Sequence, residues 1–200
     1  MSIRKRLTPA ESRLAALEAA RAILIEAGPQ AVTLKAVGQR IGRTHAALLH
    51  HFGSAAGLQR ALAEHLTTTV CDSIEEAINA ARAGIAQPRE VVDQAFDAFG
   101  REGGGALVSW LLATGHEDAI EPFVRVIHEM VDRIHPEESD HAEALAAHRS
   151  TLMIVLLGLG QSLMGDPLAA ALRLPPETAR DMAETLLVNS LASAGQPRDQ

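Results

Sequence analysis

Residues 31–62 read AVTLKAVGQRIGRTHAALLHHFGSAAGLQRAL, and this stretch decides the fold of the chain. Thr33 can cap a short helix, because the apolar residues after it are spaced three and four apart, at Leu34, Val37 and Ile41. Gly42 follows directly, where a tight turn needs a residue that tolerates positive φ. Thr44 is the expected N-cap of a second short helix, 44–52. The pattern predicts two short helices joined by a glycine turn.

The second of these helices has two faces of different character. Its inward face is formed by Ala47, Leu48, His51 and Phe52. Its outward face is formed by His45, Ala46, Leu49 and His50. Two short helices joined by a tight turn, the second with a compact outer face, have the geometry of an element that reads the major groove of DNA. We therefore expect a helix-turn-helix.

The composition of the chain predicts an all-α fold. Its 200 residues suffice for one large domain or two small ones with a real core. Aromatic residues make up 2% and tyrosine is absent, so strand-favouring clusters hardly occur, whereas helical periodicity is nearly continuous. We expect a three-helix helix-turn-helix domain over 1–53, a larger helical ligand-binding and dimerisation domain over 54–195, and a tail over 196–200.

Charge is distributed unevenly along the chain. Residues 1–65 contain nine Lys or Arg and four Asp or Glu, whereas residues 66–200 contain nine and twenty-one, for a total net charge of −7. A basic first third on an acidic remainder is typical of a DNA-binding head attached to a body that does not touch DNA.

The first helix is predicted to start at Thr8-Pro9-Ala10-Glu11, which is a capping box with proline at the first helical position. It should end near Ala27, before Gly28-Pro29. Residues 1–7 form a basic arm that either contacts phosphates and the minor groove or is a disordered tail. Its cations are Arg4, Lys5 and Arg6.

The segment from Arg13 to Leu62 resembles the N-terminal domain of the TetR family of bacterial transcriptional repressors. The resemblance covers about a quarter of the chain. It rests on an ordered set of residues with the family's spacing: Ala19, Ala20, Ile23, Leu24, Gly28, Thr33, Val37, Gly38, Gly42, Thr44, Leu48, His51, Phe52, Gly53, Ser54 and Leu58. It implies a homodimer that binds a two-fold DNA operator through helix 44–52, represses transcription, and is released by a small-molecule effector.

The sequence departs from the family pattern at positions that usually anchor phosphates. Leu49 stands where the family usually has tyrosine, and 54–56 lacks the usual lysine. Arg43 stands where a small apolar residue is common. We expect weaker or more salt-sensitive DNA binding than is usual for the family. The expected DNA-contacting residues are Arg4, Lys5, Arg6, Thr33, Lys35, Arg43, Thr44, His45, Ala46, Leu49 and His50.

The body is expected to contain a run of helices around an effector pocket. The predicted helices cover 54–83, 88–101, 106–114, 117–135, 141–164 and 176–191. The glycines at 103–105 are interpreted as a disordered loop or as a hinge beside a pocket, and a break is expected at 165–167. The residues expected to line the pocket, or simply to form the core, are Phe96, Phe99, Trp110, Phe123, Ile127 and Met130. Their scarce charge indicates a small apolar or weakly polar effector.

The stretch 152–163 is apolar nearly all round its helix. A helix that is hydrophobic on every side must be buried on every side, and in a chain of this size that indicates a partner subunit. The expected dimer interface consists of Leu152, Val155, Leu156, Leu159, Leu163, Leu186 and Leu187.

Catalytic, metal and membrane functions are not expected from the motifs. Histidines in the body lack His-x-x-x-His or Glu-x-x-His spacing, no nucleophile elbow or phosphate loop occurs, and neither a cofactor nor an enzyme is predicted. Cys71 is interpreted as a small apolar residue rather than a redox sensor, in a cytoplasmic protein without a membrane span. Two rival interpretations are a helical ligand- or partner-binding protein whose head no longer binds DNA specifically, and a small helical hydrolase.

Overall fold

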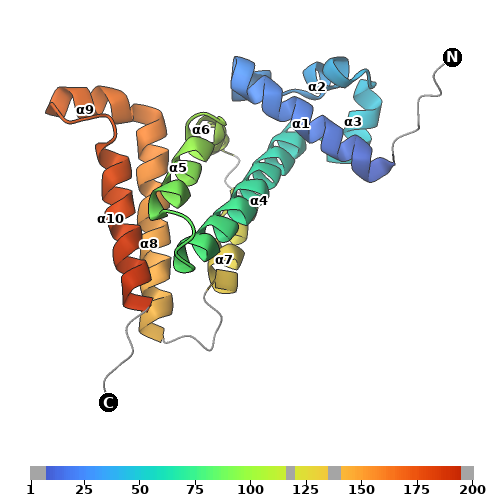
Figure 1. Cartoon of the computed structure of the whole chain (residues 1–200). Coiled ribbons are helices and arrows are strands. Elements are labelled where there is room, and N and C mark those ends of the chain that lie inside the picture. The colour runs from blue at the N-terminus through green and yellow to red at the C-terminus, as the bar shows by residue number, and fades with distance from the viewer. Residues whose placement is uncertain (1–7, 116–119, 135–140, 195–200) are drawn as a thin grey trace.

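The computed structural model describes residues 8–115, 120–134 and 141–194, with no side-chain description for 141–143 and 193–194. Regular structure within these ranges is entirely helical, as predicted (Figure 1). The elements in order are α1 (Pro9–Ala27), the 3₁₀ turn η1 (Pro29–Ala31), α2 (Leu34–Ile41), α3 (His45–Phe52), α4 (Ala55–Arg82), α5 (Pro88–Phe99), α6 (Gly104–Ala113), α7 (Glu121–Ile134), α8 (His141–Gly160), the π-helical segment η3 (Gln161–Gly165), α9 (Asp166–Leu172) and α10 (Thr178–Ala194).

The local signals that start and end the first helices act as the sequence predicts. The Thr8 hydroxyl accepts a hydrogen bond from the Glu11 N–H, and the Glu11 carboxylate accepts one from the Thr8 N–H. Thr33 and Thr44 cap α2 and α3 in the same way with their hydroxyl oxygens. Gly42, between them, has φ +66°, in the left-handed region that favours glycine. The helix-turn-helix is therefore encoded locally.

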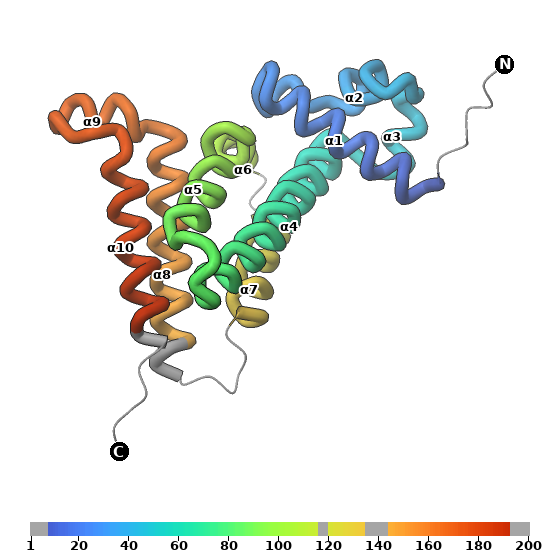
Figure 2. Tube along the Cα trace, viewed as in Figure 1, coloured from blue at the N-terminus to red at the C-terminus, as the bar shows by residue number. Residues whose placement is uncertain are grey.

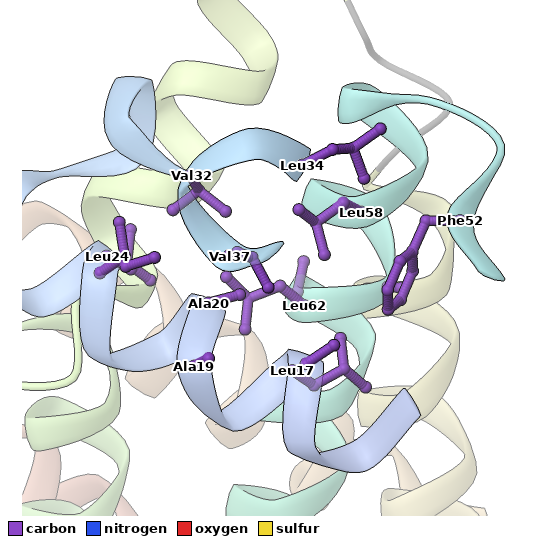
Figure 3. Close-up of a cluster of buried hydrophobic side chains, with 14 of the residues drawn as sticks. Leu17, Ala19, Ala20, Leu24, Val32, Leu34, Val37, Phe52, Leu58 and Leu62 are labelled. Atoms are coloured by element: carbon purple, nitrogen blue, oxygen red, sulfur yellow. The ribbon is translucent and has the colours of Figure 1, made fainter. Parts of the chain in front are cut away.

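The head, α1 to α3, is held by one apolar core that continues into the body. Figure 3 shows Leu24 of α1, Val37 of α2 and Phe52 of α3 in one apolar cluster with Leu62 of α4. From the body, α6 adds two buried leucines to this core, Leu107 and Leu111. The apolar core of the head thus includes residues of α4 and α6, beyond residue 53. The domain boundary expected at 53 stays a prediction.

Helix α4 is the element that joins head and body. It runs without interruption for 28 residues, from beside α1 and α3 to the far end of α5 (Figure 2). Its first apolar positions, Leu58, Leu62 and Leu66, lie in the head core, and its later ones, Val70 and Ile74, face the body. The predicted long connecting helix is confirmed.

The three glycines at 103–105 form a close-packed junction, not a disordered loop. Gly103 has φ +79° and precedes α6, and a Cβ there would lie 3.0 Å from Cγ of Leu24 in α1. A Cβ on Gly105, inside α6, would lie 2.1 Å from Oγ of Ser162 in the π-helical segment. Only residues without a side chain let the head, α6 and the α8–α9 corner approach so closely.

The prediction that the helix ends at 165–167 is wrong, because the backbone stays helical there. Gln161–Gly165 is a π-helical segment, and Pro167, which has no N–H to donate, follows it in the first turn of α9. The helix nevertheless changes direction, so that α9 lies across the end of the paired helices α8 and α10 (Figure 1). The last helix begins at Thr178 rather than at Pro176.

Ala144–Leu172 is the one stretch of the described residues long and apolar enough to cross a membrane, with a mean hydropathy of 1.5. The longest uninterrupted apolar run in the sequence, 152–160, is much shorter, so no such stretch was predicted. The stretch bends at the π-helical segment and packs on α5 and α10 along one side. Only 11% of its most apolar window is buried in the described chain.

A charged cluster fastens α10 to α5. Arg180 donates to Asp93 and to Asp97, both at 2.7 Å, and its guanidinium carbon lies 5.1 Å from the centre of the Phe96 ring. Burial raises the pKa of Asp93, but the hydrogen bonds from Arg180 and Arg89 outweigh it and hold this pKa below its ordinary range. The ionised form of Asp93 is therefore stabilised by folding.

We expect Arg180→Ala to lower the free energy of unfolding by about 1–3 kcal/mol, because it leaves two partly buried carboxylates short of a partner. Thermal unfolding should show Tm lower by roughly 2–4 °C per kcal/mol. Asp93 loses its stabilising effect as pH falls from its ordinary pKa of 3.8 through its lower folded value, so the difference from wild type should shrink over that range. Arg101→Ala is the matched control: Arg101 also pairs with Asp97 but its side chain is 81% exposed, against 19% for Arg180. Equal effects of the two changes would contradict the role given to burial.

Candidate functional site

The outward face of α3 is not covered by any other part of the described chain. His45, Ala46, Leu49 and His50 are all exposed, and Leu49 is 43% exposed despite its apolar side chain. On the opposite face Leu48 and Phe52 are buried in the head core, and His51 is half-buried. This is the predicted division of the helix, and it leaves two imidazoles and two aliphatic groups facing away from the core.

Two cations beside this face have no carboxylate partner among the described residues. Arg40 is bound to the Glu26 carboxylate through both guanidinium nitrogens, and Arg13 donates to the His51 carbonyl at 3.1 Å while lying over the Phe52 ring. Lys35 and Arg43, by contrast, are exposed, and no ion pair forms between them and the described carboxylates. They are therefore available to an external anion.

The other predicted contact residues of the head divide into two groups. Thr33 and Thr44 are exposed, and each accepts a backbone hydrogen bond at a helix start, which leaves the hydroxyl hydrogen free to donate outward. The basic arm with Arg4, Lys5 and Arg6 lies outside the described residues.

The body encloses an apolar cavity of about 130 Å³ between α4, α5, α6, α7, α8 and α10. Four of the six predicted pocket residues line it, namely Phe99, Phe123, Ile127 and Met130. Phe99 and Phe123 meet edge to face there, with ring centres 6.2 Å apart. A cavity of this size holds one molecule about as large as benzene.

Two of the predicted pocket residues are elsewhere. Phe96 is buried between α5, α8 and α10, where it packs under Arg180. Trp110 lies on the exposed side of α6 and is not part of the cavity wall. Both predictions were wrong because they used helical register alone, which does not say which neighbour each face of a helix meets.

The cavity wall also contains polar groups that the sequence did not predict. Hydroxyls from three helices line it, at Thr67, Ser150, Thr151 and Ser190, and the only charged residue in the wall is Glu102. The Thr67 hydroxyl already donates to the Ala63 carbonyl, so part of this polarity is satisfied within α4. These residues look like ordinary solvated helix positions in the sequence, and only the tertiary structure places them around one space.

The cavity wall is physically joined to the head. Leu107 of α6 lines the cavity and also belongs to the head core. Glu102, beside it in the wall, pairs with Arg21 of α1 at 3.2 Å. A molecule that moves α6 or the 100–103 turn therefore acts directly on contacts of the head.

Comparison with known proteins identifies the head. Residues 16–62 match the family model described as bacterial regulatory proteins, tetR family. The head belongs to the TetR family. No curated protein matches the chain. The whole chain is similar in fold to a crystal structure from Mesorhizobium loti, of a provisionally assigned TetR-family transcriptional regulator, with 15% sequence identity, a TM-score of 0.56, and coverage of 94% of this chain and 98% of that one. The body behind the TetR-family head thus has the TetR-like all-α fold.

This TetR-like body leaves an apolar surface uncovered along α8, η3, α9 and α10. Its exposed side chains are Leu145, Leu152, Met153, Leu156, Leu163, Met164, Leu168, Leu172, Leu174, Met182 and Val188. Exposed large apolar side chains gathered on neighbouring helices are typical of sites of interaction with proteins or membranes. We call this set the C-terminal apolar face.

The predicted interface residues do not all lie on this face. Leu152, Leu156 and Leu163 do. Leu187 is 6% exposed and packs in the core of its own chain, so that prediction is corrected. Val155 lines the cavity and is half-buried, so its place in an interface stays a prediction. The remaining two, Leu159 and Leu186, are half-buried. Residues 152–163 are apolar all round because one side packs on α5 and the other faces outward.

Cys71 lies in the cavity wall and is buried. Burial raises the pKa of its thiol to about 11, so almost no thiolate exists at neutral pH. We expect the folded protein to react with a disulfide reagent such as dithionitrobenzoate at a small fraction of the rate of the protein unfolded in guanidinium. Rapid stoichiometric labelling of the folded protein would instead support a redox role.

Proposed function

We propose that this protein is a homodimeric transcriptional repressor that binds a two-fold operator through α3 and leaves it when a small molecule enters the cavity of the body. One observation carries the proposal: the head is a TetR-family domain whose outward α3 face and adjoining cations, Lys35 and Arg43, are left unpartnered by the described chain. The proposal places the protein in the cytoplasm and assigns it no catalytic step.

Each exposed group of the head has a role in this proposal. His45 and His50 would offer ring nitrogens to base edges in the major groove, and Ala46 and Leu49 would contact thymine methyl groups. Lys35 and Arg43 would bind phosphates, together with the helix starts capped by Thr33 and Thr44 and the basic arm at Arg4, Lys5 and Arg6.

Dimerisation through the C-terminal apolar face would supply the two-fold symmetry. Helices α8 and α10 of one subunit would pack on the same pair of the other, as in a four-helix bundle. Because α8 and α10 are far from the head (Figure 1), this arrangement leaves both α3 helices free to face DNA. Such dimers read half-sites roughly 34–36 Å apart.

The effector would be a small, mainly apolar molecule. The apolar wall and the volume of about 130 Å³ favour a ligand the size of one aromatic ring, and the hydroxyls of Ser150, Thr151 and Ser190 could bind one polar substituent. Binding would favour a conformation of α4 and α6 in which the heads are wrongly spaced, and by linkage the effector and the operator would weaken each other's affinity.

A second candidate function is a ligand-binding protein whose head no longer binds DNA specifically. Leu49 favours it, because an exposed aliphatic side chain stands where the family usually offers a tyrosine hydroxyl to phosphate. Ser54 caps α4 by accepting from the Gly57 N–H at 2.9 Å, and its neutral hydroxyl supplies no positive charge in place of the lysine that is usual at this point.

The experiment that tests the repressor proposal measures binding of the purified protein to DNA from upstream of its own gene and to scrambled DNA, over a salt series. We expect preference for the upstream DNA. Arg43→Ala should weaken binding to both DNAs about equally and lower the salt slope by about one phosphate contact, whereas His50→Ala should reduce mainly the preference, at about 1–3 kcal/mol, or roughly 5–150-fold.

Arg101→Ala is the control for charge loss, since Arg101 is exposed and belongs to the body. It should leave binding to both DNAs unchanged. Equal and weak binding to both DNAs that disappears at physiological salt would contradict the repressor proposal and favour the second candidate.

A further inference from the structure

Two helices of the body bring three metal-ligating side chains together on the surface. His128 and Asp132 are four residues apart on α7, and His148 faces them from α8. The Asp132 carboxylate lies between the rings: one oxygen is 3.4 Å from Nε2 of His128 and the other is 3.6 Å from Nε2 of His148. All three ligand atoms lie within 4.8 Å of one another.

These separations fit a tetrahedral metal site. Zinc binds imidazole nitrogen and carboxylate oxygen at roughly 2.0–2.2 Å, so two ligand atoms on a tetrahedron lie about 3.3–3.5 Å apart. Each ring nitrogen lies near that spacing from an Asp132 oxygen, although His128 faces one oxygen and His148 the other. Rotation of the exposed carboxylate would turn one oxygen toward both rings and place one ion between the three residues.

A hydrogen bond behind the cluster sets up His148 as a ligand. Its Nδ1 lies 2.7 Å from the Ala144 carbonyl oxygen, which can only accept, so Nδ1 carries the hydrogen. With Nδ1 holding this hydrogen, Nε2 is the ring nitrogen that faces the Asp132 carboxylate and is placed to bind an ion beside it. A carbonyl that holds the distal N–H is also the usual second-shell support of a metal-bound histidine.

We propose that His128, Asp132 and His148 bind a divalent first-row transition-metal ion of the zinc class, with water in the fourth position. Two imidazoles and one carboxylate suit such an ion and not calcium or magnesium, which prefer all-oxygen sites. The expectation of no metal site rested on the spacings His-x-x-x-His and Glu-x-x-His. This cluster instead has His-x-x-x-Asp on α7, and its third ligand comes from another helix.

The ion would tie together two walls of the cavity. Ile127 and Ala147, the chain neighbours of His128 and His148, both line the cavity. Fixing α7 to α8 at this point restricts how far that side of the cavity can open. Metal binding would therefore stabilise the body and change its capacity for a ligand. The inference does not depend on whether the head binds DNA.

The test is a calorimetric titration of untagged, chelator-treated protein with Zn²⁺ alone, repeated with Co²⁺ while visible absorption is recorded. We expect one ion per chain, tetrahedral Co²⁺ bands that Zn²⁺ displaces, and a Tm higher by roughly 5–10 °C at a hundredfold excess over Kd. Asp132→Asn and His148→Gln should each weaken binding by more than the roughly 10–100-fold that loss of a second-shell partner costs.

His65→Gln is the matched control. His65 also meets a carboxylate, Glu18, at 2.8 Å, but no third ligand joins that pair among the described residues. The control should bind Zn²⁺ as wild type does. Absence of saturable binding by wild type would overturn the proposal, and so would wild-type affinity in Asp132→Asn and His148→Gln. The changed ligands Asp132 and His148 are exposed, His65 is half-buried, and far-UV circular dichroism checks that the variants remain folded.

Discussion

Leu152→Glu combined with Leu156→Glu is expected to make the protein monomeric and to weaken operator binding by at least about 100-fold. These leucines are 58% and 54% exposed at the centre of the C-terminal apolar face. In a two-fold dimer each substitution occurs twice, so four leucines leave the interface and four carboxylates enter it. Each lost leucine removes about 1.5–3 kcal/mol of apolar burial, and each buried charge adds a desolvation cost.

The effect on DNA follows from the linkage of two heads in one particle. A dimer binds its second half-site as an intramolecular step, which raises affinity by roughly 10²–10⁴ over a single head. Sedimentation equilibrium measures the oligomeric state, and fluorescence anisotropy with operator DNA measures affinity. Ile85→Glu is the control, because Ile85 is an isolated apolar residue, 82% exposed in the turn after α4. A double variant that remains dimeric would contradict the assignment of the interface.

Gly105→Val is expected to lower the free energy of unfolding by about 1–3 kcal/mol, the usual cost of overpacking a close-packed site. Even the first added carbon would lie 2.1 Å from Oγ of Ser162 and 3.0 Å from the Phe99 carbonyl oxygen. Ser162 can turn its hydroxyl away only by giving up its 2.7 Å hydrogen bond to the Leu159 carbonyl. Helix α6 would be displaced instead, and with it Leu107 in the head core.

Chemical denaturation followed by circular dichroism measures this loss. Ala106→Val is the matched control, since it adds the same branched side chain one position later on α6, where the residue is exposed. Its cost should be within about 0.5 kcal/mol, from helix propensity alone. Equal losses for the two variants would show that the tight junction at Gly105 is not the cause.

Local signals in the sequence were sufficient to predict the helix-turn-helix. Thr8, Thr33 and Thr44 each form a cap within their own turn, and Gly42 needs only its own φ angle. These contacts involve only residues that are close in the sequence, which is why the boundaries of α1, α2 and α3 agree with the prediction. The exposed side of α3 followed from the same short-range geometry.

Features that depend on distant neighbours were not predictable in this way. Phe96 and Trp110 have the same apolar spacing as the cavity residues, but α8 and α10 cover the first and nothing in the described chain covers the second. The glycines at 103–105 resemble a flexible linker in sequence, and only the approach of Leu24 and Ser162 reveals them as a packing site.

The continuity of α4 gives a measure of how small a change in the body can matter. Leu62 in the head core and Ile78 in the cavity wall lie on the same rigid rod, about 24 Å apart at 1.5 Å per residue. A tilt of α4 by about 5° at the cavity moves the end of α4 in the head by about 2 Å. In a dimer with two such helices, the distance between the recognition helices would change by about 4 Å. The major-groove repeat of DNA, roughly 34 Å, would stay the same. A ligand that shifts one wall slightly would therefore change the distance between the two heads, and they would no longer match the DNA.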